Sequence, residues 1–242
     1  MSVPYLSIVI ACYNESPHLK WSVGEIIRVM DYTHYSYELI FIDDCSQDDT
    51  RRLIQELIDK YSHSHNMRSL FHEKNTGRGG AVNDGIRLAK GTIVGFLDVD
   101  LVIHPHYIPA MVWAIEDGYD IATALRIYPL KMGENIFRHV LSRGYRFLTK
   151  LFLKNRLYDT ETGFKFFRRD KIIPILKSVE DKGWFWDTEI MLRSYYNNLK
   201  IIEIPCLEIK KIKKKSTVRI FRDTLDYLIK IWKFRRNYID KM

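Results

Sequence analysis

Short apolar runs alternate with amphipathic stretches along the first half of the chain. Five runs rich in β-branched and aromatic residues predict β-strands over residues 5–11, 37–42, 67–72, 93–97 and 119–124. Between them, apolar residues at helical spacing predict helices over residues 17–30, 51–61, a segment ending at 90, and 105–116. Strands that alternate with helices are typical of a mostly parallel sheet with helices on both faces. The pattern therefore predicts an α/β fold.

The alternation ends after Arg126, and the second half of the chain predicts a mixed set of elements. They are a long helix over 136–153, a short strand over 163–169, a helix ending near 196, a strand over 200–209 and a final helix over 216–239. We expect residues 1–210 to form one domain and residues 211–242 to form a basic amphipathic helix.

The positive charge of the chain is concentrated in this last segment. Residues 205–242 hold 12 Lys and Arg against 4 Asp and Glu, an excess that equals the net charge of +8 for all 242 residues. The apolar positions of the final helix recur at helical spacing, at Val218, Phe221, Leu225, Leu228 and Trp232. Such a helix either lies on an anionic membrane surface or packs on the core with its outer side solvated. No nucleic-acid recognition module accompanies the charge, so we expect no nucleic acid partner.

The composition indicates an ordinary globular protein. Apolar residues make up 46% of the chain and charged residues 28%, which argues against disorder. The cysteines Cys12, Cys45 and Cys206 show no paired spacing, which favours a reducing compartment and argues against disulfides or a zinc site. No uninterrupted apolar window is long enough to span a membrane, and the first apolar run reads as a strand rather than a signal peptide.

Two carboxylates, Asp98 and Asp100, follow the apolar run of residues 93–97 directly. In open α/β sheets, ligands bind beyond the carboxyl ends of the strands. Mg²⁺ takes one or two carboxylates and completes its shell with waters and substrate phosphates. The pair therefore either holds a divalent cation or caps the following helix.

A glycine-rich turn covers residues 75–81. The dinucleotide fingerprint fails because Val82 stands where its third glycine is required, and the lysine and hydroxyl residue of a P-loop are also missing. These absences argue against NAD-dependent oxidoreductases and P-loop NTPases. The turn either brings backbone close to a ligand, at Gly77, or packs its helix tightly.

Six sequence blocks occur in the order that one known family shows. They are SIVIACYNES, IDDCSQDDT, NTGRGGAVNDG, FLDVDL, DTETGFKFFRR and FWDTEIM. The chain thereby resembles glycosyltransferase family 2, which has a GT-A fold. It is most similar to the branch that transfers sugars from nucleotide donors to dolichyl or other polyprenyl phosphates, and more to glucosyl than to mannosyl enzymes.

The resemblance implies a set of site residues. The expected substrate-binding residues are Ala11, Tyr13, Glu15, Asp43, Asp44, Gly77, Asp98, Arg143, Asp159, Thr162, Gly163 and Lys215. The expected ligands of Mg²⁺ or Mn²⁺ are Asp98 and Asp100. The expected catalytic residues are Asp100, Arg126, Asp187 and Glu189.

The predicted function is an inverting, metal-dependent sugar transfer to dolichyl or polyprenyl phosphate. UDP-glucose is favoured as donor over GDP-mannose, and the enzyme is expected to lie peripherally on the cytoplasmic membrane face. One alternative is a family-2 enzyme acting on a glycan or other hydroxyl, which would need Asp187 or Glu189 as a base. A second alternative is a non-catalytic module that binds nucleotide sugars.

Overall fold

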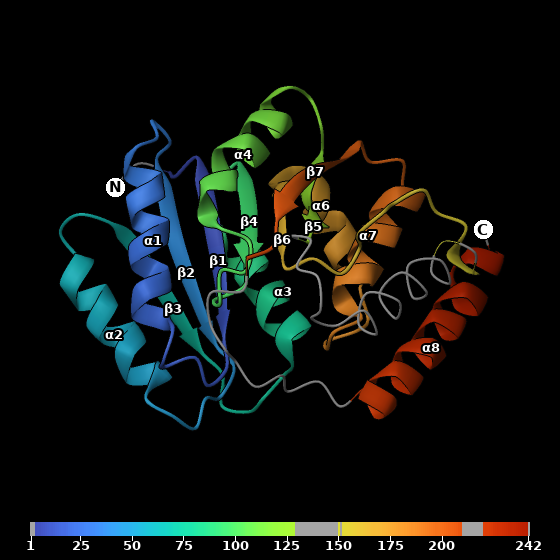
Figure 1. The fold of residues 1–242 in the computed structure, drawn as a ribbon, viewed down its shortest axis with the longest axis horizontal. Helices are drawn as coiled ribbons and strands as arrows, with labels where there is room; N and C mark the ends of the chain where they lie inside the picture. The colour runs from blue at the N-terminus through green and yellow to red at the C-terminus, as the bar shows by residue number, and fades with distance from the viewer. Residues whose placement is uncertain (1–2, 129–149, 151, 210–219, 242) are drawn as a thin grey trace.

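A computed structural model describes residues 3–128, 150, 152–209 and 220–241, and its described strands form one seven-stranded sheet in the order β3-β2-β1-β4-β6-β5-β7. The strands are β1 (Leu6–Cys12), β2 (Tyr37–Asp43), β3 (Asn66–Phe71), β4 (Ile93–Leu97), β5 (Ile121–Ile127), β6 (Phe164–Arg168) and β7 (Ile201–Leu207). The helices are α1 (Leu19–Asp31), α2 (Thr50–Tyr61), α3 (Arg78–Leu88), α4 (Ile108–Glu116), α6 (Arg169–Leu176), α7 (Trp186–Tyr196) and α8 (Ile220–Asn237), with short 3₁₀ turns at Pro105–Tyr107 and Ile239–Lys241. Figure 1 shows their arrangement.

The sheet is parallel except for β6. Strand β6 runs antiparallel to both of its neighbours, β4 and β5, whereas β1 pairs in parallel with β2 and β4, and β5 pairs in parallel with β7. The carboxyl ends of the parallel strands therefore share an edge with the loop that enters β6. The predicted mostly parallel α/β sheet is confirmed.

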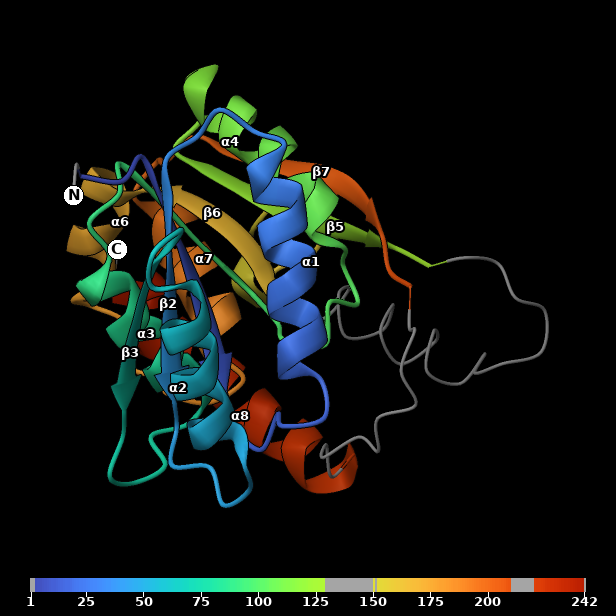
Figure 2. The same cartoon turned by 90° about the vertical axis from the view of Figure 1, so that its left-hand side faces the viewer.

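Helices cover both faces of this sheet because its central strands are buried on both sides. Helices α1, α2 and α4 pack on one face and α3, α6 and α7 on the other, as Figure 2 shows. Strand β4 contributes to both layers: Ile93 and Leu97 belong to the first core, Val94 and Phe96 to the second. The alternation follows from the pleat of the strand, which points successive side chains to opposite faces.

Helix α8 lies along the outer side of α7 (Figure 1), where Ile231 and Phe234 pack against Phe185 and Leu192. The buried stripe is not the one that the sequence pattern predicted, since Leu228 and Trp232 are exposed. Among the side chains that the structure describes, helix α8 therefore has two neighbouring apolar stripes, and the one at Ile231 and Phe234 is buried against the protein. The residues before 220 in the predicted final helix lie outside the described part of the chain.

One further segment differs from the sequence prediction, and another cannot be compared with it. Helix α6 forms where no element was predicted, although Pro174 within it lacks the backbone N–H of a regular helix. The predicted helix over 136–153 lies mostly outside the described residues. No helix in the part of the chain that the structure describes is long and apolar enough to cross a membrane.

The docking of α8 predicts that truncating two adjacent side chains lowers the free energy of unfolding by unequal amounts. Ile231 is 3% exposed and Trp232 is 54% exposed. Ile231→Ala should lower the free energy of unfolding by about 2 kcal/mol through the cavity it leaves, and Trp232→Ala should change it by less than about 0.5 kcal/mol. Urea unfolding of both variants measures the difference. Equal losses in the two variants would contradict this packing.

Candidate active site

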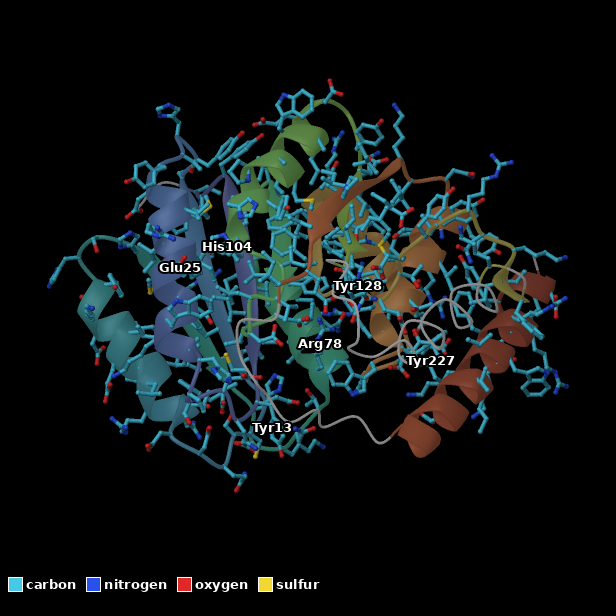
Figure 3. The ribbon with its side chains drawn as sticks, viewed as in Figure 1. Tyr13, Glu25, Arg78, His104, Tyr128 and Tyr227 are labelled. Carbon is cyan, nitrogen blue, oxygen red and sulfur yellow. The ribbon has the colours of Figure 1, made fainter. Side chains whose placement is uncertain are left out.

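The predicted site residues gather at the carboxyl edge of the sheet, beside the switch point between β1 and β4. Strands β1 and β2 deliver the loops after Cys12 and Asp43, and β4 delivers Asp98. Strand β5 carries Arg126 near its end, and the loop before β6 reaches the same edge. Figure 3 shows Tyr13 and Arg78 toward the lower side of the view, where these strands end. Ligands in open α/β sheets bind at such a switch point.

Backbone contacts tie the loops after β1 and β2 together. Asn14 N donates to Ser46 Oγ at 2.9 Å, and Glu15 N donates to Thr50 Oγ1 at 2.8 Å. Asn14 adopts the left-handed conformation with φ 55°, which asparagine tolerates better than most residues. Tyr13 is 48% exposed and Ala11 is half-buried in the strand. Tyr13 and Glu15 are thus held on a defined loop rather than a loose one.

The two aspartates after β2 have different surroundings. The carboxylate of Asp44 accepts hydrogen bonds from Thr76 N at 2.7 Å and Gly77 N at 2.8 Å, so it holds the glycine-rich turn in place. Asp43 is 1% exposed, and its Oδ1 has no hydrogen-bond partner among the described residues. A buried acceptor atom without a partner is costly, so Asp43 is the better candidate of the two to bind a ligand donor.

The glycine-rich turn packs tightly against the segment before α7. Gly77 has φ +88°, and a Cβ atom there would lie 2.4 Å from the carbonyl oxygen of Lys182. A Cβ at Gly79 would lie 2.3 Å from the Cβ of Trp186. Of the two alternatives left open for this turn, tight packing is what the described residues display. Its consequence is to place the next residue, Arg78, at the centre of the site.

Arg78 bridges two of the predicted site carboxylates. Its Nε and Nη2 donate to Asp98 Oδ1 at 3.0 and 2.7 Å, and its Nη1 donates to Asp187 Oδ2. The guanidinium also lies 5.5 Å from the ring centre of Phe96 and 5.6 Å from that of Trp184. Burial works against the charged form, but the two carboxylates raise the pKa of Arg78 above its ordinary value. Arg78 therefore stays positively charged, and its guanidinium is shared between Asp98 and Asp187.

Lys165, in strand β6, is a second cation that contacts Asp187. It lies in β6 with no exposed surface, and its Nζ donates to Asp187 Oδ1 at 2.8 Å and to the Thr162 carbonyl. Burial lowers the pKa of Lys165, whereas Asp187 opposes that shift. An unpaired buried charge is strongly unfavourable, so Lys165 and Arg78 fix the position of Asp187 between them.

The turn of Asp98 and Asp100 is anchored to its surroundings. Asp98 N donates to the Gly163 carbonyl at 3.0 Å, and Leu101 takes φ 46° as its N–H bonds Asp98 O at 3.1 Å. Gly163 leaves room for the Asp98 carboxylate, since a Cβ there would lie 1.8 Å from Oδ2. Two carboxylates suit Mg²⁺ or Mn²⁺. No third His, Cys, Asp or Glu joins them among residues that the structure describes.

Arg126 is held by Asp159 in a bidentate ion pair. Its Nε and Nη2 donate to the two Asp159 oxygens at 2.7 and 2.8 Å. Burial acts to raise the pKa of Asp159, but the adjacent guanidinium lowers it below the ordinary value. Glu203 accepts the Tyr158 and Asp159 N–H groups and so fixes this loop. The structure thus brings Arg126 and Asp159 together, and the carboxylate of Asp159 neutralises the positive charge of Arg126.

Glu161 is an acidic residue of the same loop that the sequence analysis did not assign. Its Oε2 lies 3.6 Å from Arg126 Nη2, and the side chain is 32% exposed. Burial raises the pKa of Glu161 to about 7; Asp159 and Asp187 add to the rise and Arg126 opposes it. Glu161 therefore changes charge near neutral pH.

Glu189 is the predicted catalytic residue that the structure keeps away from the others. It is 3% exposed and accepts hydrogen bonds from Asp181 N at 2.8 Å and Arg193 Nε at 2.7 Å. Residues two apart on a helix do not face each other, so Asp187 faces the site while Glu189 braces the segment before α7. Arg143 and Lys215 lie outside the described residues.

The remaining predicted residues lie in the loop that enters β6. Thr162 is fully buried, and no described residue bonds its Oγ1. Arg78, Glu161 and Lys165 are site residues that were not predicted from the sequence, although all three stand inside quoted blocks. A lysine within the apolar strand FKFFR was the available signal, because a buried ammonium requires an acidic partner.

Comparisons with known proteins identify the family of this chain. Residues 7–176 match the family described as Glycosyl transferase family 2. The chain belongs to glycosyl transferase family 2. This confirms the family that the sequence blocks indicated and, with it, the class of enzyme.

Curated relatives of this family-2 chain come from archaea and eukaryotes. Glycosyltransferase AglD of Haloferax volcanii is 30% identical over 207 residues, which span 83% of this chain but 32% of AglD. Dolichyl-phosphate beta-glucosyltransferase of Dictyostelium discoideum is 27% identical over 253 residues, 96% of this chain and 77% of that protein. The human enzyme of the same name is 26% identical over 82% of this chain and 65% of its own length.

Solved structures show the fold of this family-2 chain. Glucosyl-3-phosphoglycerate synthase from Mycobacterium tuberculosis, in complex with phosphoglyceric acid, superposes with a TM-score of 0.67 at 17% identity, covering 94% of this chain and 80% of that one. The same enzyme with Mg²⁺ and uridine diphosphate gives 0.66 at 16% identity, covering 94% and 79%. The predicted GT-A fold is confirmed.

The raised pKa of Glu161 predicts a pH-dependent effect on stability. The pKa is ordinarily near 4.5 and is about 7 in the folded protein. Above pH 7 the folded protein holds an ionised Glu161 at a cost, so stability falls as pH rises through that value. Glu161→Gln should raise the free energy of unfolding by about 1–2 kcal/mol near pH 8 and by less near pH 5, the partial exposure keeping the gain below the full shift.

Thermal or urea unfolding of Glu161→Gln at both pH values measures this gain. Glu73→Gln, an exposed glutamate outside the site, is the matched control and should show no such dependence. A gain that is equal at the two pH values would contradict the prediction.

Proposed function

We propose that this protein transfers a sugar, with glucose favoured, from a nucleotide-diphosphate donor to dolichyl or another polyprenyl phosphate. The observation that carries the proposal is that two strand ends bring Asp43 and the Asp98–Asp100 pair to one edge of the sheet, and that Arg78 links Asp98 there to Asp187 at the start of α7. The two dolichyl-phosphate beta-glucosyltransferases among the relatives support the acceptor and the sugar. GDP-mannose stands as the second donor.

The donor is proposed to lie across the switch point. The exposed Tyr13 and the buried, unpartnered Oδ1 of Asp43 would bind its nucleoside. Its diphosphate would lie near Asp98 and Asp100, which would hold Mg²⁺ or Mn²⁺. Structures of the M. tuberculosis synthase with Mg²⁺ or Mn²⁺ and uridine diphosphate support that assignment. A divalent cation there would neutralise the departing diphosphate.

The acceptor is proposed to approach from the side of Asp187. A phosphate monoester has a second pKa near ~6, so it is an anion at neutral pH and needs no strong base to attack the anomeric carbon. The bond from that carbon to the diphosphate oxygen breaks as the new bond forms on the opposite face, and the configuration inverts. With such an acceptor Asp187, which Arg78 and Lys165 hold in place, would not act as a base. It would contribute only its fixed position and its negative charge. A hydroxyl acceptor would instead require it as a base.

The carboxylate pair gives the direct test of this function. Asp100→Ala should lower transfer from UDP-glucose to dolichyl phosphate about 100-fold or more in the presence of Mn²⁺, because the developing diphosphate charge loses its stabilisation. Radiolabelled sugar in the lipid phase measures the rate, with GDP-mannose run in parallel. Asp117→Ala, an exposed residue after α4, is the control. Undiminished transfer by Asp100→Ala would contradict metal dependence, and transfer to hydroxyl acceptors alone would contradict the lipid phosphate.

Helix α8 is proposed to hold the enzyme on an anionic membrane surface at the cytoplasmic face. Its outer side exposes Leu228 at 39%, Ile229 at 51% and Trp232 at 54%. Arg236 lies 5.4 Å from the centre of the Trp232 ring, so a cation accompanies the apolar stripe. Aromatic and apolar side chains flanked by basic residues are typical of helices that lie in a membrane interface. A polyprenyl phosphate would be reached from such a position.

Vesicle binding tests this attachment. The double substitution Leu228→Ser, Trp232→Ser should weaken binding to vesicles that contain phosphatidylserine by about tenfold or more, because interfacial binding scales with buried apolar area. Co-sedimentation measures the bound fraction. Trp113→Ser is the matched control, since Trp113 is 64% exposed on α4. Equal binding by the wild type and the double variant would contradict the proposal.

A further inference from the structure

Arg78 occupies the carboxylate that the proposed function assigns to a metal. Both Nε and Nη2 donate to the same oxygen, Asp98 Oδ1, at 3.0 and 2.7 Å. The other oxygen, Oδ2, lies against the backbone of Gly163, where a Cβ would come within 1.8 Å of it. A cation that takes Asp98 as a ligand therefore meets a carboxylate that is already paired.

A divalent cation and the Arg78 guanidinium repel each other when both approach this carboxylate. Both carry positive charge, and the Arg78 side chain is only 16% exposed, so solvent screens their repulsion weakly. In the absence of metal the two cations Arg78 and Lys165 balance the two carboxylates Asp98 and Asp187. A divalent cation adds two positive charges at Asp98 and upsets that balance. Arg78 can leave Asp98 because it also contacts a second carboxylate, that of Asp187.

Arg78 also has contacts that do not involve Asp98. Its Nη1 bonds Asp187 Oδ2, and the ring of Trp184, which is 54% exposed, lies 5.6 Å from the guanidinium. A guanidinium displaced from Asp98 keeps both contacts. The displacement would change the charge that faces Asp187, the residue beside which the acceptor is proposed to react.

We propose that Arg78 is a positioning residue that competes with the divalent cation for Asp98 and, when the metal binds, gives up Asp98 and keeps its bond to Asp187. The inference rests on the proposed function for the identity of the cation. It adds that metal occupancy and the charge around Asp187 are coupled through one side chain. The metal-free protein thereby keeps both carboxylates neutralised by Arg78 and Lys165.

The experiment is a titration of the full chain with Mn²⁺ in the absence of a nucleotide-sugar donor. The electron paramagnetic resonance signal of free Mn²⁺ measures how much of the metal is bound. Competition predicts that Arg78→Met tightens the Mn²⁺ dissociation constant by about tenfold, the factor that corresponds to one lost charge-assisted hydrogen bond. Arg78→Lys should lie between the wild type and Arg78→Met, because an ammonium contacts Asp98 without the paired N–H bonds of the guanidinium. Arg87→Met removes an exposed arginine from the same helix and should match the wild type.

The direction of the change decides between competition and simple support. If Arg78 merely braces Asp98 for the metal, Arg78→Met weakens Mn²⁺ binding or leaves it unchanged, and either result overturns the inference. Arg78→Lys keeps the inference testable should the methionine variant fold poorly, since competition still requires tighter binding than in the wild type.

Failure of the proposed function gives a different result. Asp98→Asn should abolish Mn²⁺ binding in both the wild-type and the Arg78→Met backgrounds. Binding that survives this substitution shows that the metal lies elsewhere and counts against the proposed metal site. Binding that is lost, together with an Arg78→Met constant no tighter than that of the wild type, counts against the competition alone.

Discussion

The ion pairs of Asp187 with Arg78 and Lys165 are the interaction on which the candidate site depends. Lys165 is fully buried and Asp187 is 2% exposed, so neither charge is stable without the other. Arg78 extends the pairing to Asp98. The four residues come from the start of α3, the end of β4, strand β6 and the start of α7. The cluster therefore fixes four segments of the chain relative to one another.

Two features of the fold allow these segments to meet. Strand β6 is antiparallel to its neighbours, so the loop of residues 159–163 enters the sheet at the edge where the parallel strands end. The glycine-rich turn approaches the segment before α7 so closely that a Cβ at Gly77 would overlap the Lys182 carbonyl. The first feature places Asp159 and Lys165, and the second places Arg78. The loops after β1 and β2 join the site through Asp44, which holds the same turn.

Helix α8 packs on the body of the protein with one apolar stripe and exposes another. One stripe, at Ile231 and Phe234, packs on α7, and Lys230 bonds Asp181 at 2.8 Å in the segment that the glycine turn contacts. The adjacent stripe, at Leu228 and Trp232, is exposed. The buried stripe fits the interpretation as a helix packed on the core, and the exposed stripe is the one proposed to contact a membrane. The hydrogen bonds of Thr188 to Tyr227 and Thr160 carry the contact on to the site loop.

Local hydrophobic pattern and short motifs were enough to predict the strands, most of the described helices, the family and the order of the carboxylates along the chain, whereas helix α6 was not predicted. Asp98 was predictable because an apolar strand ends directly before it. The partners were not predictable: Arg78 and Asp187 are 109 residues apart in the sequence and meet only when α3 and α7 pack on one face. The same holds for Glu189, whose buried contacts turn it away from the site. Burial and pairing of charge are properties of the packed structure, and only the tertiary structure decided them.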